Sequence, residues 1–196
     1  MNILEIIKPI TLLRGSHEDT GSTGHGCAMN VIAYLNGETE ITDSSPCVCP
    51  VIRKILVWFN DFLNNDERQE LLPIMLRAMG SVTDDIRVMK PRLSALVDFS
   101  DGMADLSSAA SAASAANAAN AAYAAAANAA NAANAANAAN AAISAISVIV
   151  KYGDYSRDRG KIKQIAFAFF DAALPKQPEF GKAVLARAEQ LTELSS

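Results

Sequence analysis

An alanine-rich repeat constrains this chain more than any other segment. Residues 109–142 comprise 24 alanines, seven asparagines, two serines and one tyrosine, largely as Ala-Ala-Asn triplets. Alanine has the highest helix propensity, and no Gly or Pro lies between Met103 and Tyr152, so we expect a helix. If continuous from Ala104 to Val150, it would be about 70 Å long. Such a helix either projects as a stalk or folds back within the repeat.

The triplet repeat presents no constant chemical face. Three residues advance about 300° around a helix, so each successive Asn is displaced by about 60° from the previous one. A flat ligand-binding or ice-binding stripe is therefore not expected. No charged residue lies between Asp105 and Lys151, which excludes acid, base and metal-carboxylate chemistry from the segment. Two interpretations stay open: a rod that packs closely against a partner helix or a second copy, and a soluble spacer.

The two flanks of the repeat carry an ordinary mixture of apolar and charged residues, and their patterns are helical. We predict an all-α fold with a compact helical N-terminal domain (1–102), the Ala/Asn-repeat helix (103–151) and a C-terminal helical pair (152–196). Helices are predicted at 27–36, ended by Gly37, and at 51–63, where apolar residues follow helical spacing. We also expect 15–26 to be an exposed loop, since it is polar and rich in Gly.

Proline and capping residues divide the remaining segments. Asn65 is expected to cap a helix that runs to Gly80 and is kinked or split at Pro73. A further helix should begin near residue 83 or 84 and be disturbed by Pro91. The C-terminal pair is predicted at about 159–174 and 179–194, separated by Pro175 and Pro178.

Charge and hydropathy exclude several classes of partner. The net charge of −4 argues against nucleic-acid binding, which needs clustered Lys and Arg. Because Asn interrupts the long uncharged stretch, no window of about 18 residues is continuously apolar, and we expect no membrane span. The first residues lack the pattern of a secretory signal, so a cytoplasmic protein is expected.

The cysteines and histidines form the strongest candidate for chemistry. His25-Gly-Cys27 is followed, after 19 further residues, by Cys47-Val-Cys49, and His17 is nearby. Thiolates and imidazoles suit tetrahedral zinc, although structural zinc sites usually place two to four residues between paired ligands and here each pair has one. Zinc bound by His17, His25, Cys27, Cys47 and Cys49 is therefore one alternative. Buried reduced cysteines that pack as small hydrophobes are another.

A thiol nucleophile is the third interpretation of the same region. Cys27 stands at the predicted N-terminus of a helix, where the helix dipole would lower the pKa of its thiol. The base would have to be His17 or His25, since no histidine follows residue 25, and Asp43 is a candidate partner in the neighbouring loop.

The sequence contains three short motifs: a G-x-H (Gly15 to His17), a C-x-M-x-x-x-A-Y-x-x-G-E (Cys27 to Glu38) and a C-x-[CS]-P-V-I (Cys47 to Ile52), followed by a helix with Trp58-Phe-Asn60-Asp61. Together these motifs resemble those of a family of uncharacterised actinobacterial and bacteriophage proteins. The family also carries a long Ala-rich tract. The resemblance implies a shared site and a phage or mobile-element origin, but no activity. The implied site residues are His17, Cys27, Glu38, Asp43 and Cys47.

Two departures from the family pattern bear on that site. Members often have Glu where this chain has Asn30, and Ser where it has Cys49. A role that needs a carboxylate at position 30, or zinc ligation by Cys49, is weakened by these differences. We therefore predict a non-enzymatic interaction or scaffold protein that binds a protein partner or self-associates through the Ala-rich helix. The alternative is a zinc-binding or thiol-dependent enzyme that uses His17, Cys27 and Cys47.

Overall fold

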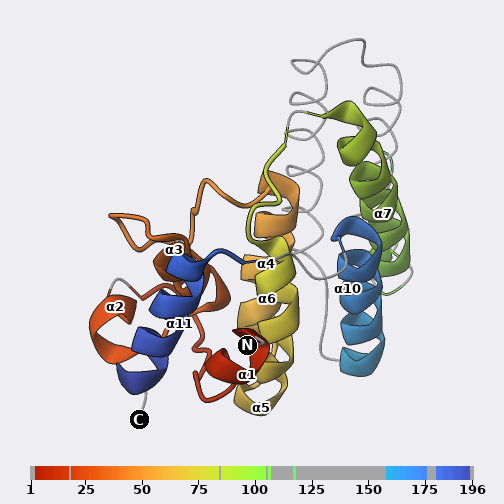
Figure 1. Ribbon diagram of the computed structural model, residues 1–196. Helices are drawn as coiled ribbons and strands as arrows, with labels where there is room; N and C mark the ends of the chain where they lie inside the picture. Colours follow the sequence, from red (N-terminus) through yellow and green to blue (C-terminus); the bar gives the residue numbers. More distant parts are fainter. Residues whose placement is uncertain are drawn as a thin grey trace. The chain divides into compact units, whose positions relative to one another are not determined.

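The computed structural model describes residues 3–17, 19–83, 85–104, 106, 117, 158–175 and 180–194 (Figure 1). Within these residues the regular structure is helical throughout, and the only β-type pairing is an isolated parallel bridge between Leu12 and Gly26. The predicted all-α fold is confirmed. The Ala/Asn repeat lies outside the described residues except for Asn117, so the helix expected at 103–151 and the domain boundaries that depend on it stay predictions.

The chain divides into two compact units, each of which is assembled from separate stretches of sequence. The first unit comprises Met1–Cys49, Leu56–Val82 and Pro175–Ser196, and the second comprises Pro50–Ile55 and Thr83–Leu174. The helices of the first unit are α1 (Ile3–Ile7), α2 (Thr20–Thr23), α3 (Ala28–Asn36), most of α4 (Pro50–Phe62), α5 (Asn65–Arg68), the 3-10 turn η1 (Gln69–Leu71), α6 (Leu72–Ala78) and α11 (Lys182–Leu194).

In the first unit, the last helix of the chain packs against the first ones. Helix α11 contacts α1, α2 and α3, and α6 contacts α1 and α3 (Figure 1). The Thr192 hydroxyl donates a 2.8 Å hydrogen bond to the Ile6 carbonyl, and Arg187 Nη1 donates one of 3.0 Å to the Leu35 carbonyl. The two ends of the sequence therefore close one hydrophobic core around α3.

Helix α3 begins and ends where its sequence predicts. Cys27 is the N-cap residue, and Gly37 ends the helix in the left-handed region with a φ of 76°. An amino acid with a Cβ is strained in that conformation, whereas glycine adopts it freely. The Arg187 guanidinium lies directly against Gly37, so a side chain at this position would also displace the arginine.

The helical run after α4 is split before Pro73, as the sequence predicts, but its N-cap residue differs from the prediction. Asn64, rather than Asn65, is the N-cap residue: its side chain accepts from the Glu67 amide at 2.9 Å, and the Glu67 carboxylate accepts from the Asn64 amide at 3.2 Å. This reciprocal pair satisfies two amides at the helix start. Pro73 then lies in the first turn of α6, where its missing N–H costs no helical hydrogen bond.

The polar segment 15–26 is more ordered and more buried than its composition suggests. It contains the short helix α2, and Thr20 is fully buried, with its hydroxyl donating to the His17 carbonyl at 3.0 Å. The Leu13 amide donates to the Gly26 carbonyl at 2.8 Å. Gly26 lies so close to the Thr20 side chain that a Cβ would collide with it. The expectation of an exposed loop is therefore wrong for Thr20, Gly24 and Gly26, which are buried, whereas Ser16, Asp19 and Thr23 are exposed.

In the second unit, helices α7 (Ile86–Ala104) and α10 (Arg159–Ala173) pack together. Phe99 and Phe169 meet edge to face with ring centroids 5.7 Å apart, and Gly102 leaves space for the Ile165 side chain. Pro91, expected to disturb this segment, lies inside α7, which continues through it as one helix. Helices α10 and α11 both form close to their predicted ranges, and each belongs to a different unit.

Candidate functional site

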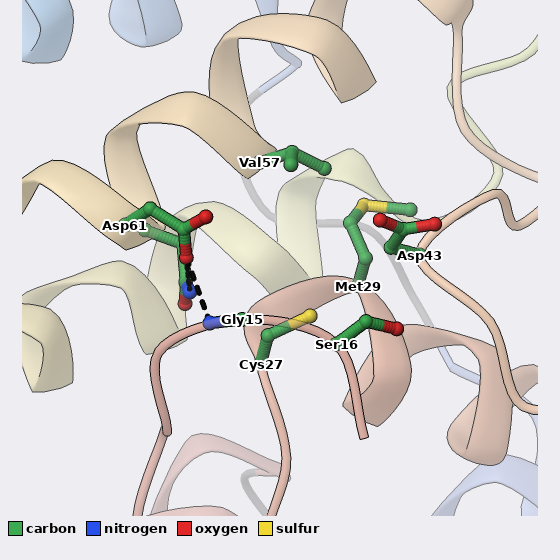
Figure 2. A pocket seen from close by; sticks show the side chains of 8 residues that line it. Gly15, Ser16, Cys27, Met29, Asp43, Val57 and Asp61 are labelled. Atoms are coloured by element: carbon green, nitrogen blue, oxygen red, sulfur yellow. Dashed lines mark hydrogen bonds between the residues drawn. The ribbon is translucent and has the colours of Figure 1, made fainter. Parts of the chain in front are cut away.

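A small pocket in the first unit brings together several of the residues that the sequence singled out. Its volume is about 30 Å³, and it lies between the segment before α2, the start of α3, the loop after α3 and the inner face of α4 (Figure 2). The lining residues are Gly15, Ser16, Cys27, Met29, Asp43, Val57, Asn60 and Asp61. A volume above about 15 Å³ admits a water molecule, whereas small-molecule sites have about 300 Å³ or more.

Two adjacent residues of α4 hold the walls of this pocket in place. Asn60 is 1% exposed; its Oδ1 accepts from the Ala28 amide at 3.2 Å, and its Nδ2 donates to the Leu13 carbonyl at 3.0 Å. Asp61 Oδ1 accepts from the Gly15 amide at 2.8 Å and from Asn60 Nδ2 at 3.2 Å (Figure 2). These side chains therefore supply hydrogen bonds that the irregular backbone around them needs.

Cys27 is buried, with 3% of its surface exposed, and lines the pocket. Burial raises the pKa of its thiol from the usual 9.0 to about 11, because a thiolate would lose its hydration. The negative charges of Asp43 and Asp61 act in the same direction, while the backbone amides of Asn30 and Met29 oppose them. The amides at the helix N-terminus lower the pKa as expected, but desolvation outweighs them, so the expectation of a lowered pKa for Cys27 is wrong.

The structure brings Asp43 to Cys27 but directs His17 elsewhere. Asp43 lines the pocket with Cys27, whereas His17 is not among its lining residues. The His17 ring places Nε2 at 2.9 Å from the Arg14 carbonyl, so this nitrogen is the protonated donor. Its backbone amide donates to Asn30 Oδ1 at 2.7 Å. The geometry therefore gives Cys27 a carboxylate neighbour and no histidine partner in the pocket.

Cys47 belongs to a separate polar cluster in the loop after α3. Its Sγ lies 3.1 Å from the hydroxyl of the fully buried Ser45, which in turn contacts the Glu38 carboxylate. Ser45 donates its single hydroxyl hydrogen to Glu38, so the Cys47 thiol is the donor to Ser45. Asn36 Nδ2 adds a 3.0 Å hydrogen bond to Glu38. Glu38 and Cys47, two residues of the family-implied site, are therefore joined through Ser45 in this cluster, whereas Cys27 and Asp43 line the pocket.

The remaining candidate ligands do not join either group. Cys49 is buried as the N-cap residue of α4, and its amide donates to the Ser81 hydroxyl at 2.9 Å. His25 is partly buried, and its Nδ1 has no hydrogen-bond partner among the described residues. All three cysteines are free. No three His, Cys, Asp or Glu residues of the described ranges gather to hold a metal ion, so the zinc alternative gains no support there.

Sequence reasoning missed the structural importance of Asn60 and of Arg68, which is only 2% exposed. Arg68 donates to the carbonyls of Asn60 at 2.8 Å and Leu63 at 2.7 Å, and to Asn65 Oδ1 at 2.8 Å. These bonds satisfy the C-terminal end of α4, where carbonyls lack helical partners. A signal for Asn60 was present in the sequence, since it lies four residues after Leu56 and three before Leu63, within the apolar stripe of α4.

No family model, curated protein or solved structure matches this chain. The resemblance to the actinobacterial and bacteriophage family therefore stays a prediction. Among the helices that the structure describes, none is long and apolar enough to cross a membrane.

Proposed function

We propose that this chain is a non-enzymatic interaction protein, in which a folded helical part carries the Ala/Asn tract as a scaffold for association. The observation that carries the proposal is that the candidate site is buried and its pocket is small. Cys27 is buried and its pKa is raised, and the pocket beside it admits one small ion or water molecule but no organic substrate. These features weigh against the alternative of a thiol-dependent enzyme.

The composition of the Ala/Asn tract supports a role in association. Residues 106–150 contain no charge that would repel a second copy, and alanine permits close approach of helices on every side. Asn side chains both donate and accept, so they can pair with one another laterally. These residues lie outside the described part of the chain, and their role here rests on their sequence.

Self-association is the form of this function that can be tested directly. The family resemblance implies a phage or mobile-element origin. A protein of that origin would also have a host or phage protein as a candidate partner. The full chain is expected to form a reversible oligomer, measured as a concentration-dependent mass by sedimentation equilibrium.

A charge variant and a neutral variant of the tract form the matched pair. Asn131→Glu combined with Asn134→Glu and Asn137→Glu keeps helix propensity but places three like charges along the tract. The same three positions changed to Gln keep it neutral. We expect the Glu variant to be monomeric and the Gln variant to associate like the wild type. A wild-type chain that is monomeric at every concentration, or a Glu variant that still associates, contradicts self-association through the tract.

A further inference from the structure

Two buried sulfur atoms face the same small pocket. Cys27 and Met29 come from the start of α3, are 3% and 0% exposed, and both line the cavity (Figure 2). Because one is the N-cap residue and the other lies in the first turn, their backbone positions are fixed by the helix. Thiolate and thioether sulfur are the soft ligands that proteins use for Cu(I).

The pocket also carries two negative charges, one of which is near a described cation: Asp61 interacts electrostatically with Arg68. Asp43 and Asp61 are its charged lining residues, and no Lys or Arg lines it. Asp61 is engaged by the Gly15 amide and by Asn60. No hydrogen bond or ion pair to another described residue engages the Asp43 carboxylate, so it faces the pocket without a partner there.

We propose that this pocket binds one soft monovalent metal ion of the Cu(I) class, held by the sulfur atoms of Cys27 and Met29, with the Asp43 carboxylate as a third ligand. The cavity of about 30 Å³ accommodates a single ion. On binding, the thiol proton of Cys27 leaves to solvent as the sulfur–metal bond forms, and no electron is transferred. The site is independent of the association proposed above.

The ligand chemistry distinguishes this ion from the commoner ones. Zinc favours four ligands from Cys, His and carboxylate groups, and no such group of three gathers among the described residues. Mg²⁺ and Ca²⁺ need about six oxygen ligands, more than Asp43, Asp61, Asn60 and Ser16 supply together once their internal bonds are counted. Two sulfurs and one carboxylate suit an ion that accepts low coordination.

The test uses the full chain with Cys47 and Cys49 both changed to Ser, so that Cys27 is the one remaining thiol. Cu(I) is titrated anaerobically in competition with a colorimetric Cu(I) chelator. We expect one equivalent to bind, with thiolate-to-copper absorption in the ultraviolet. Met29→Leu, which conserves volume, should weaken binding about tenfold or more, and Asp43→Asn by about 10-fold to 100-fold. Zn²⁺ and Mg²⁺ should not compete.

The same titration can overturn the proposal. It fails if the two-serine background binds no Cu(I) while its circular dichroism matches that of the wild type. It also fails if Cys27→Ser in that background retains the ion, or if Met29→Leu binds as tightly as its parent. The Met29 variant keeps the test decisive even if Cys27→Ser does not fold.

Discussion

Replacement of Asn60 by alanine tests the claim that α4 organises the irregular backbone of the first unit. The Asn60 side chain is almost fully buried and joins three segments: it accepts from Ala28, the first residue of α3, and donates to the Leu13 carbonyl and to Asp61. In Asn60→Ala the amide of Ala28 and the carbonyl of Leu13 lose these partners inside the protein.

The expected cost follows from the number of groups left without a partner. Each buried polar group whose partner is removed costs about 1–3 kcal/mol. Two such backbone groups give an expected loss of about 2–6 kcal/mol in the free energy of unfolding, and the side-chain cavity adds to it. A small domain is stable by about 5–15 kcal/mol, so the variant is expected to remain folded but with a clearly lower urea midpoint.

Urea denaturation followed by the fluorescence of Trp58, the single tryptophan of the chain, measures this loss. Asn36→Ala is the matched control: Asn36 is exposed and its side chain makes one hydrogen bond, to Glu38, so a change below about 0.5 kcal/mol is expected. If Asn60→Ala costs no more than Asn36→Ala, the reasoning that this buried amide supports two segments of backbone is refuted.

Three further predictions concern Cys27, Gly37 and Arg68. The folded pKa of Cys27, about 11, exceeds its usual 9.0, so its contribution to stability is complete below pH 9 and lost between pH 9 and 11. Relative to Cys27→Ala, the metal-free wild type should lose about 2 kcal/mol across that window in urea melts, and parallel curves would contradict this. In urea melts, Gly37→Ala should lower the free energy of unfolding by about 1 kcal/mol more than Gly80→Ala does. Both glycines have a positive φ, but only Gly37 lies against Arg187. Equal losses would show that the arginine moves freely. Arg68→Met should lower the free energy of unfolding by about 3 kcal/mol by leaving the carbonyls at the end of α4 unpaired, and a thermal melt unchanged from wild type would argue against that role.

Local patterns in the sequence were sufficient to predict most helices of the described residues. Each of these signals affects the backbone only within a few residues of its own position. They are the apolar spacing of α4, the glycine after α3 and the prolines near α6 and α10. Helix hydrogen bonds also join residues four apart, so signals of that range determine where helices begin and end. The one-residue error at Asn64 shows the limit of this reasoning, because two adjacent asparagines can each cap a helix.

The character of the candidate site was decided by tertiary contacts. Its position at a helix N-terminus predicts an acidic thiol at Cys27, yet burial against α4 and the charges of two aspartates reverse the shift. Likewise, asparagine is usually found at the surface, but Asn30 is fully buried, and its Oδ1 accepts a hydrogen bond from the His17 amide.

The sequence by itself determined that this protein is helical, where most of its described helices lie, and that its repeat can carry no acid–base chemistry. Only the tertiary structure decided which helices pack together, that α11 closes the core around α3, and that Cys27 and Met29 face one pocket. The physical reason is range: helix formation depends on neighbours within one or two turns, whereas desolvation and charge at a buried atom depend on whatever the fold brings within a few ångströms.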